Sequence, residues 1–205
     1  MRNILLFTVS LLAIVYSYID IKAWKYVLTT LIILSAYKKI YSFDFKNIFG
    51  LNFKKNQLIP FIVVSVICAV SFNYYIESIL PSSKIEKNSA LTHLLWFIQP
   101  LFQSFNEEVY FRAQYFSIID KFIKNKLMQS LLFSLVFSLG HGILCLIVFN
   151  IQLKGEVYLV LFIATIIMNH LYLKYNNIIF SWAIHFGINF SFFGGNYFLG
   201  DTELK

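Results

Sequence analysis

Residues 127–149 read LMQSLLFSLVFSLGHGILCLIVF, a run of 23 residues that contains no Asp, Glu, Lys or Arg. A helix crosses the hydrocarbon core of a bilayer with about 20 mostly apolar residues, so this run predicts a transmembrane helix. Similar runs recur along the chain, and we expect an all-α, multi-pass transmembrane helical bundle of about seven spans. The expected spans are Asn3 to Ile19, Trp24 to Tyr37, Leu58 to Leu80, Ser89 to Ile119, Leu127 to Phe149, Val157 to Leu173 and Ile178 to Leu199.

The composition of the whole chain agrees with this prediction. Of its 205 residues 59% are hydrophobic and only 13% are charged, whereas soluble domains carry about 25% charged residues. We therefore expect a single membrane domain over residues 1–205. Connections between the runs are short, except for an aromatic, Lys-bearing segment from Lys38 to Gln57 that we expect to lie in the membrane interface.

The formal net charge of +7 comes mostly from Lys and Arg between the apolar runs, where such residues set membrane orientation. We therefore expect a lipid bilayer and no nucleic acid as partner. The distribution favours a cytoplasmic N-terminus, and a composition rich in residues with AT-rich codons suggests a bacterial plasma membrane. The first run resembles a signal peptide, but bulky residues from Val15 to Ile19 stand where cleavage needs small ones, so we expect a retained helix.

A few ionisable and polar residues stand inside the predicted spans. Each ionisable one costs about 2.5 to 3.5 kcal/mol to insert and therefore needs a partner or a function. Residues four apart share a helical face, which predicts that Glu108 pairs with Arg112 and leaves Glu107 on another face, free to point at a cavity. The candidate site residues are Glu107, Glu108, Arg112, His141, His185 and Asn189.

These residues are predicted to lie at similar depth. Measured from the loops after the fourth and sixth runs, Glu107, His141 and His185 lie roughly 18, 21 and 12 Å deep at 1.5 Å per residue. By the same spacing rule, His185 and Asn189 share one face, and Phe137 lies beside His141. Pro100 can kink the fourth run. Gly140, Gly142 and Gly187 flank the histidines, where we expect either close helix approach or a water-filled gap.

Three motifs within the stretch from Pro100 to Phe193 resemble those of a known family. Residues 107–112 (EEVYFR) fit EExxxR, residues 137–141 (FSLGH) fit FxxxH, and residues 185–189 (HFGIN) fit HxxxN. In this order they resemble the CAAX prenyl endopeptidase and bacteriocin-processing family of intramembrane proteases (CPBP), whose bacterial members are often called Abi proteins. The N-terminal half resembles the family only as generic membrane helices.

The resemblance implies hydrolysis of a peptide bond within or near the membrane, in a membrane-associated peptide or protein. It implies that Glu107 is the general base that activates a water and that Glu108 and Arg112 hold its surroundings. His141 would position or activate the water, and His185 and Asn189 would stabilise the oxyanion. Donors fixed in a desolvated site suit this chemistry.

A zinc ion is the alternative to this metal-free site, because the family has carried the label metalloprotease. Catalytic zinc uses three protein ligands and a water, and here the ligands would be Glu107, His141 and His185. The chain has no HExxH pair, and the resemblance favours a site without a metal or other cofactor.

Three functions are compatible with the sequence. The favoured one is a CAAX-type intramembrane endopeptidase, with a role in bacteriocin maturation or self-immunity. The second is an immunity or regulatory membrane protein that binds a toxin, receptor or kinase without cutting it. The third is a transporter or channel whose buried charges line a pathway, which the motif order disfavours.

Overall fold

The computed structural model describes residues 8–14, 16, 23–41, 55–79, 90–149 and 152–191. Every element in these ranges is helical, and residues 8–14 and 16 are helical too. The elements are α2 (Ala23–Tyr41), α4 (Lys55–Ile79), α5 (Ala90–Glu108), the π-helical segment η1 (Val109–Tyr115), α6 (Phe116–Ile119), α7 (Lys126–Phe149), α8 (Gly155–Tyr175) and α9 (Ile179–Asn189).

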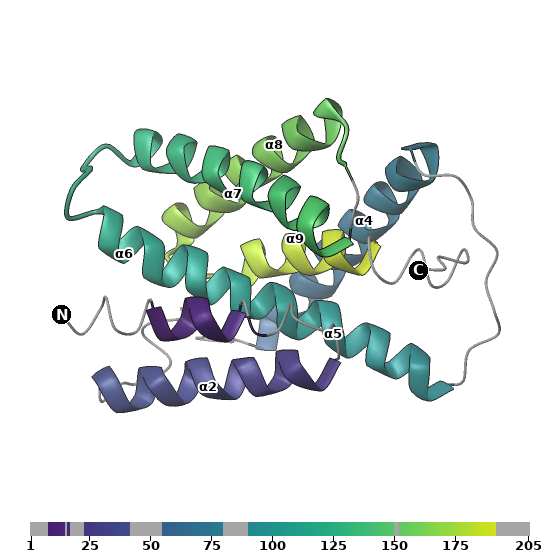
Figure 1. Ribbon diagram of the computed structural model, residues 1–205, viewed down its shortest axis with the longest axis horizontal. Coiled ribbons are helices and arrows are strands. Elements are labelled where there is room, and N and C mark those ends of the chain that lie inside the picture. The colour runs from purple at the N-terminus through teal and green to yellow at the C-terminus, as the bar shows by residue number, and fades with distance from the viewer. Residues whose placement is uncertain are drawn as a thin grey trace.

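In Figure 1, α5, η1 and α6 form one long rod with α2 on one side and α7 and α8 on the other. This rod, Ala90 to Ile119, matches the expected fourth span almost residue for residue. The helix α7 likewise matches the expected fifth span within one residue, and α8 extends the sixth by two residues at each end. The helical prediction is confirmed for these elements.

The number of membrane spans stays a prediction. In the part of the chain that the structure describes, two helices are long and apolar enough to cross a membrane, Lys126–Ile147 in α7 and Gly155–Tyr175 in α8. Shorter apolar stretches lie in α2 and α4. Residues 192–199 of the expected last span, 42–54 of the expected interfacial segment and most of the flanks of the first span lie outside the described residues.

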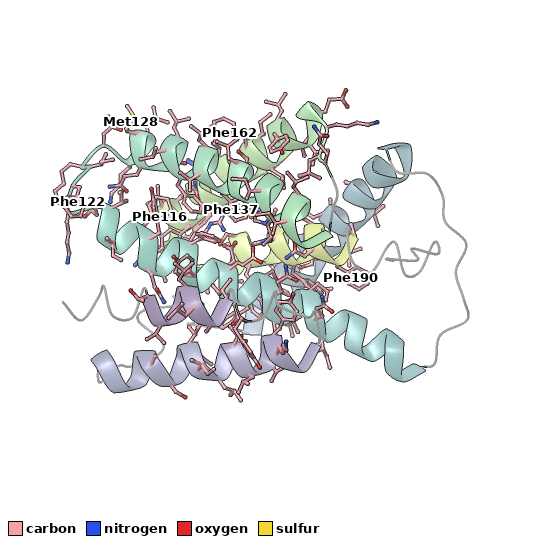
Figure 2. All side chains as sticks on the ribbon, in the orientation of Figure 1. Phe116, Phe122, Met128, Phe137, Phe162 and Phe190 are labelled. Carbon is pink, nitrogen blue, oxygen red and sulfur yellow. The ribbon has the colours of Figure 1, made fainter. Side chains whose placement is uncertain are left out.

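The short helix α9 occupies the interior and packs against α4, α5 and α8. Eight of its eleven residues are buried. By contrast, many large apolar side chains of α4 and α7 point outward and are exposed, as expected for surfaces that face lipid. Figure 2 shows the same division, with Phe137 between the helices and Phe122 at the outer end of the bundle.

A buried polar contact fixes α2 against α5 directly beside the candidate site. The Asn106 amide donates to the Tyr26 carbonyl oxygen over 3.0 Å, and the Thr30 hydroxyl donates to Asn106 Oδ1 over 2.7 Å. Buried polar groups need such partners, because an unmade hydrogen bond costs about 1 to 3 kcal/mol. The contact therefore sets the rotation of α5 at the residue before Glu107.

The turn between α6 and α7 is closed by side chains outside the apolar segments. Asn125 Oδ1 accepts from the Met128 amide over 3.1 Å and caps the start of α7. Hydrogen bonds from Lys126 and Gln129 hold the pKa of the Asp120 carboxyl below its usual value, so Asp120 stays charged and ties the end of α6 to α7.

The turn between α8 and α9 is short because Asn176 ends α8 in the left-handed conformation, with φ of 46°. Asn177 Oδ1 then accepts from the Ile179 amide over 2.8 Å, which starts α9. The tight turn sends α9 straight back into the bundle and so brings His185 to the interior.

Candidate active site

The six predicted site residues come from three parts of the fold. Glu107 and Glu108 end the α-helical part of the rod, and Arg112 lies in η1. His141 lies on α7, and His185 and Asn189 lie on α9. The π-helical turn directly after the glutamates was not predicted, and π turns inside α-helices are frequent at functional sites.

The predicted pairing of Glu108 with Arg112 is confirmed. Arg112 Nη1 donates to Glu108 Oε1, and both side chains are completely buried. The guanidinium also faces the rings of Phe133 and Phe137, at 5.2 and 5.4 Å from its central carbon to the ring centroids. The aromatic faces add a cation–π attraction, so Glu108 and Arg112 form a neutral, desolvated pair in the interior.

His185 connects the two glutamates, an arrangement that the sequence did not predict. Its Nδ1 lies 2.7 Å from Glu108 Oε1, and its Nε2 lies 3.4 Å from Glu107 Oε2. Because Arg112 keeps Glu108 ionised, the Nδ1–H donates to that carboxylate and Nε2 is the ring nitrogen that faces Glu107. The sequence had placed His185 and Asn189 on one helical face, and among the described residues no hydrogen bond joins their side chains.

His141 approaches Glu107 from the other side. Its Nε2 lies 3.6 Å from Glu107 Oε2, and its Nδ1 lies 3.0 Å from the Phe137 carbonyl oxygen. The predicted neighbourhood of Phe137 and His141 is thus confirmed, with ring centroids 4.1 Å apart. A carbonyl can only accept, so Nδ1 carries the hydrogen and Nε2 presents its lone pair to Glu107 in the neutral ring.

Glu107 lies outside the Glu108 and Arg112 pair, as predicted, but it has a hydrogen-bond partner that was not predicted. Its side chain is buried, and Oε1 accepts a hydrogen bond from Gln103 Nε2 over 3.2 Å. The other oxygen, Oε2, faces the Nε2 atoms of both histidines. Gln103, one turn earlier, reaches Glu107 along the same face of α5.

Asn189 lies one turn beyond His185 on α9 and is 7% exposed. Its side-chain Nδ2 has no hydrogen-bond partner in the described structure. A buried amide without a partner costs free energy and is unusual in folded proteins. Asn189 therefore holds a donor that is available to an incoming group.

Two of the three glycines make the expected close helix approaches. A Cβ on Gly187 would lie 2.5 Å from the Ser65 carbonyl oxygen of α4, and a Cβ on Gly142 would lie 2.2 Å from the ring of Tyr158 on α8. At Gly140 nothing lies within 4 Å of such a Cβ, so no close helix approach is found there, and the alternative of a water-filled gap stays a prediction. α5 continues as a helix through Pro100.

The donor atoms fit a metal ion as well as a water. One ligand atom from each of Glu107, His141 and His185 lies within 4.8 Å of the others. Zinc bonds of about 2.0 to 2.2 Å in a tetrahedron place two ligand atoms about 3.4 Å apart, which is close to the observed 3.4 and 3.6 Å. Both histidines also anchor Nδ1, as zinc ligands usually do. When bound, zinc would make the attached water more acidic.

Gln103 is the neighbour of the site that sequence reasoning missed. The signal was present, since Gln103 and Glu107 stand four residues apart, the spacing that predicted the Glu108 and Arg112 pair. Tyr26 on α2 also lies near the site. Its buried hydroxyl lies near Gln99 and interacts electrostatically with Glu107. No pattern in the sequence predicts this contact. It depends on tertiary packing.

The comparisons with known proteins give one family match. A family model described as type II CAAX prenyl endopeptidase, Rce1-like, matches residues 89–191, which include all six site residues and the helices from α5 to α9. Searches of curated proteins and of solved structures gave no match. The match covers half of the chain and coincides with the three motifs, so the chain belongs to the Rce1-like family of type II CAAX prenyl endopeptidases.

Proposed function

We propose that this protein is an intramembrane endopeptidase in which Glu107 activates a water to hydrolyse a peptide bond. The family is one of membrane-embedded proteases. The observation that carries the proposal is the environment of Glu107, whose Oε2 is faced by two histidine Nε2 atoms at 3.4 and 3.6 Å in a buried site. Glu108 is already neutralised by Arg112, so Glu107 is the carboxylate left for chemistry.

The proposed reaction begins when Glu107 Oε2 takes a proton from a water whose second proton is held by His141 Nε2. The water oxygen forms a bond to the carbonyl carbon of the substrate, and the carbonyl electron pair moves to its oxygen. Asn189 Nδ2 and a protonated His185 donate to this oxyanion. The oxyanion then collapses, the C–N bond breaks, and the amine nitrogen receives the proton from Glu107, which regenerates the base.

The scheme requires a hydrogen on both ring nitrogens of His185, because Nδ1–H donates to Glu108 while Nε2–H donates to the oxyanion. Two carboxylates and one guanidinium leave one negative charge in the buried cluster, and a proton on His185 cancels it while Nδ1–H stays on Glu108. Unbalanced charge in a desolvated site is expensive. The imidazolium then offers its Nε2–H on the side where Glu107 and the substrate meet.

We further propose that the substrate is a membrane-associated peptide or protein and that the site serves bacteriocin maturation or self-immunity in a bacterial plasma membrane. A site built from α5, α7 and α9 inside the bundle suits a substrate that enters from the bilayer. We keep the expectation of a metal-free site as a proposal, with zinc held by Glu107, His141 and His185 as the alternative.

The test is cleavage of an internally quenched peptide that ends in a farnesylated CAAX sequence, together with a panel of membrane peptides, by purified protein in proteoliposomes. Glu107→Gln should lose cleavage by at least about 100-fold while inserting normally. Glu156→Gln is the matched control, because Glu156 lies in the exposed first turn of α8. Equal activity of Glu107→Gln and the wild-type protein would exclude this mechanism.

The same preparation separates the two alternatives. Loss of cleavage after dialysis against a strong chelator, with recovery on adding zinc, would favour the metal-dependent site. If Glu107→Gln still protected cells from a toxin while cleaving nothing, the non-proteolytic immunity role would replace the peptidase role.

A further inference from the structure

We propose that Gln103 is a positioning residue for Glu107, which holds one carboxylate oxygen so that the other faces the two histidines. The inference rests on the proposed function, because it assigns Gln103 a part in the action of the same base. Gln103 lies outside the three motifs that suggested the site, and it neither contacts the histidines nor reaches the reacting atoms in the described contacts.

The two carboxylate oxygens of Glu107 have different neighbours. Gln103 Nε2 donates to Oε1 over 3.2 Å, while Oε2 lies 3.6 Å from His141 Nε2 and 3.4 Å from His185 Nε2. Both Gln103 and Glu107 are buried. Oε1 is thus the anchored oxygen, and Oε2 is the oxygen that meets the water.

The hydrogen bond from Gln103 restrains the orientation of the Glu107 carboxylate. The last torsion of a Glu side chain is broad and roughly two-fold, so intrinsic torsional preference does not fix the plane of the carboxylate. A hydrogen bond to an ionised acceptor is stronger than one between neutral groups and is directional. Gln103 therefore selects the plane in which Oε2 lies between His141 and His185.

The neighbours of Gln103 keep it in place and also supply a control. Gln99, Gln103 and Glu107 follow each other at intervals of four residues and line one buried face of α5. Tyr26 of α2 packs at this face, where its hydroxyl lies near Gln99. Gln99 is thus the same residue type on the same face, one turn further from the site.

The matched variants are Gln103→Met and Gln99→Met, which keep length and apolar volume and remove the amide. Loss of a group that orients a reacting ligand typically lowers activity by 10 to 100-fold. In proteoliposomes with the farnesylated reporter we expect Gln103→Met to lower kcat by about tenfold, with KM within about twofold. Gln99→Met should keep both constants within about twofold. A kcat for Gln103→Met equal to that of Gln99→Met would overturn the inference.

A spectroscopic measurement tests the inference whether or not the reporter is cleaved. The infrared difference between wild type and Glu107→Gln identifies the carboxylate bands of Glu107. These bands should shift in Gln103→Met and stay in place in Gln99→Met, because Gln103 donates to Oε1 and Gln99 lies one turn further away on α5. Unchanged bands in Gln103→Met would overturn the positioning role.

Two outcomes distinguish a wrong role for Gln103 from a wrong role for Glu107. Activity of Glu107→Gln at the wild-type level would remove the proposed base, whatever Gln103→Met does. An inactive Glu107→Gln together with a fully active Gln103→Met would leave the base in place and remove only its anchor.

Discussion

Replacing Arg112 with Met should destabilise the protein more than almost any other single change. The guanidinium and its partner Glu108 are both completely buried, and Arg112 Nη1 donates to this carboxylate. Met keeps the apolar contact with Phe133 and Phe137 but leaves Glu108 with His185 and Ser181 as partners and without the guanidinium charge. Breaking a buried pair in this way costs about 3 to 5 kcal/mol.

A loss of about 3 kcal/mol lowers the folding equilibrium constant by more than about 100-fold, since 1.4 kcal/mol is a factor of ten. His185 Nδ1 still donates to Glu108 in this variant, so we expect the lower end of the range. The double variant Glu108→Gln/Arg112→Met carries no unpaired charge. It should recover about 2 kcal/mol relative to the sum of the single changes.

The assay is reversible unfolding in mixed detergent micelles as the fraction of a denaturing detergent rises. Trp182 fluorescence is a suitable signal, because this side chain packs between Phe61 and Phe105 and donates to the Leu101 carbonyl. Lys124→Met is the control, since Lys124 belongs to an exposed pair with Asp120 and should change nothing measurable. Equal stability of Arg112→Met and the control would refute the claim of a buried, mutually dependent pair.

Two more variants test how the interior helices are held. Gly187→Ala should cost about 1 to 3 kcal/mol, because the new Cβ meets the Ser65 carbonyl oxygen at 2.5 Å and backbone cannot easily move away; the measurement is the same unfolding assay. Asn106→Leu should cost about 1 to 3 kcal/mol and also lower reporter cleavage, because it removes the polar contact between α2 and α5 beside Glu107.

Each of these variants has a matched comparison. Gly140→Ala adds the same methyl group in open space on α7 and should be neutral or slightly stabilising, because Ala favours helix over Gly. Thr30→Val removes the partner of Asn106 Oδ1, and its effect should not add to that of Asn106→Leu. Greater damage from Gly140→Ala than from Gly187→Ala, or full additivity at Thr30 and Asn106, would contradict the packing described here.

Much of the helical framework could be predicted from hydrophobicity alone. The runs that became α7 and α8 are continuous and apolar, so their length and composition determine them. The pairing of Glu108 with Arg112 and the contact of His141 with Phe137 followed from helical spacing, which is a local property. The candidate site was thus recognisable where its contacts lie within one helix.

The contacts between helices could not be predicted in the same way. His185 bridges both glutamates because the tight turn at Asn176 directs α9 into the bundle, and no spacing rule on α9 reveals this. The burial of Glu107 depends on packing between helices, which helical spacing does not reveal. At Gly140 the sequence left close helix approach and a water-filled gap both open, and nothing lies within 4 Å of a Cβ there.

The most direct test of the central claim is a mass analysis of products formed in water enriched in oxygen-18. Wild-type protein in proteoliposomes, given the farnesylated reporter and the panel of membrane peptides, should release two fragments, with one labelled oxygen in the new carboxyl end. Glu107→Gln, inserted to the same level, should release neither. Identical labelled fragments from Glu107→Gln, or intact peptides after incubation with the wild-type protein, would contradict an intramembrane peptidase based on Glu107.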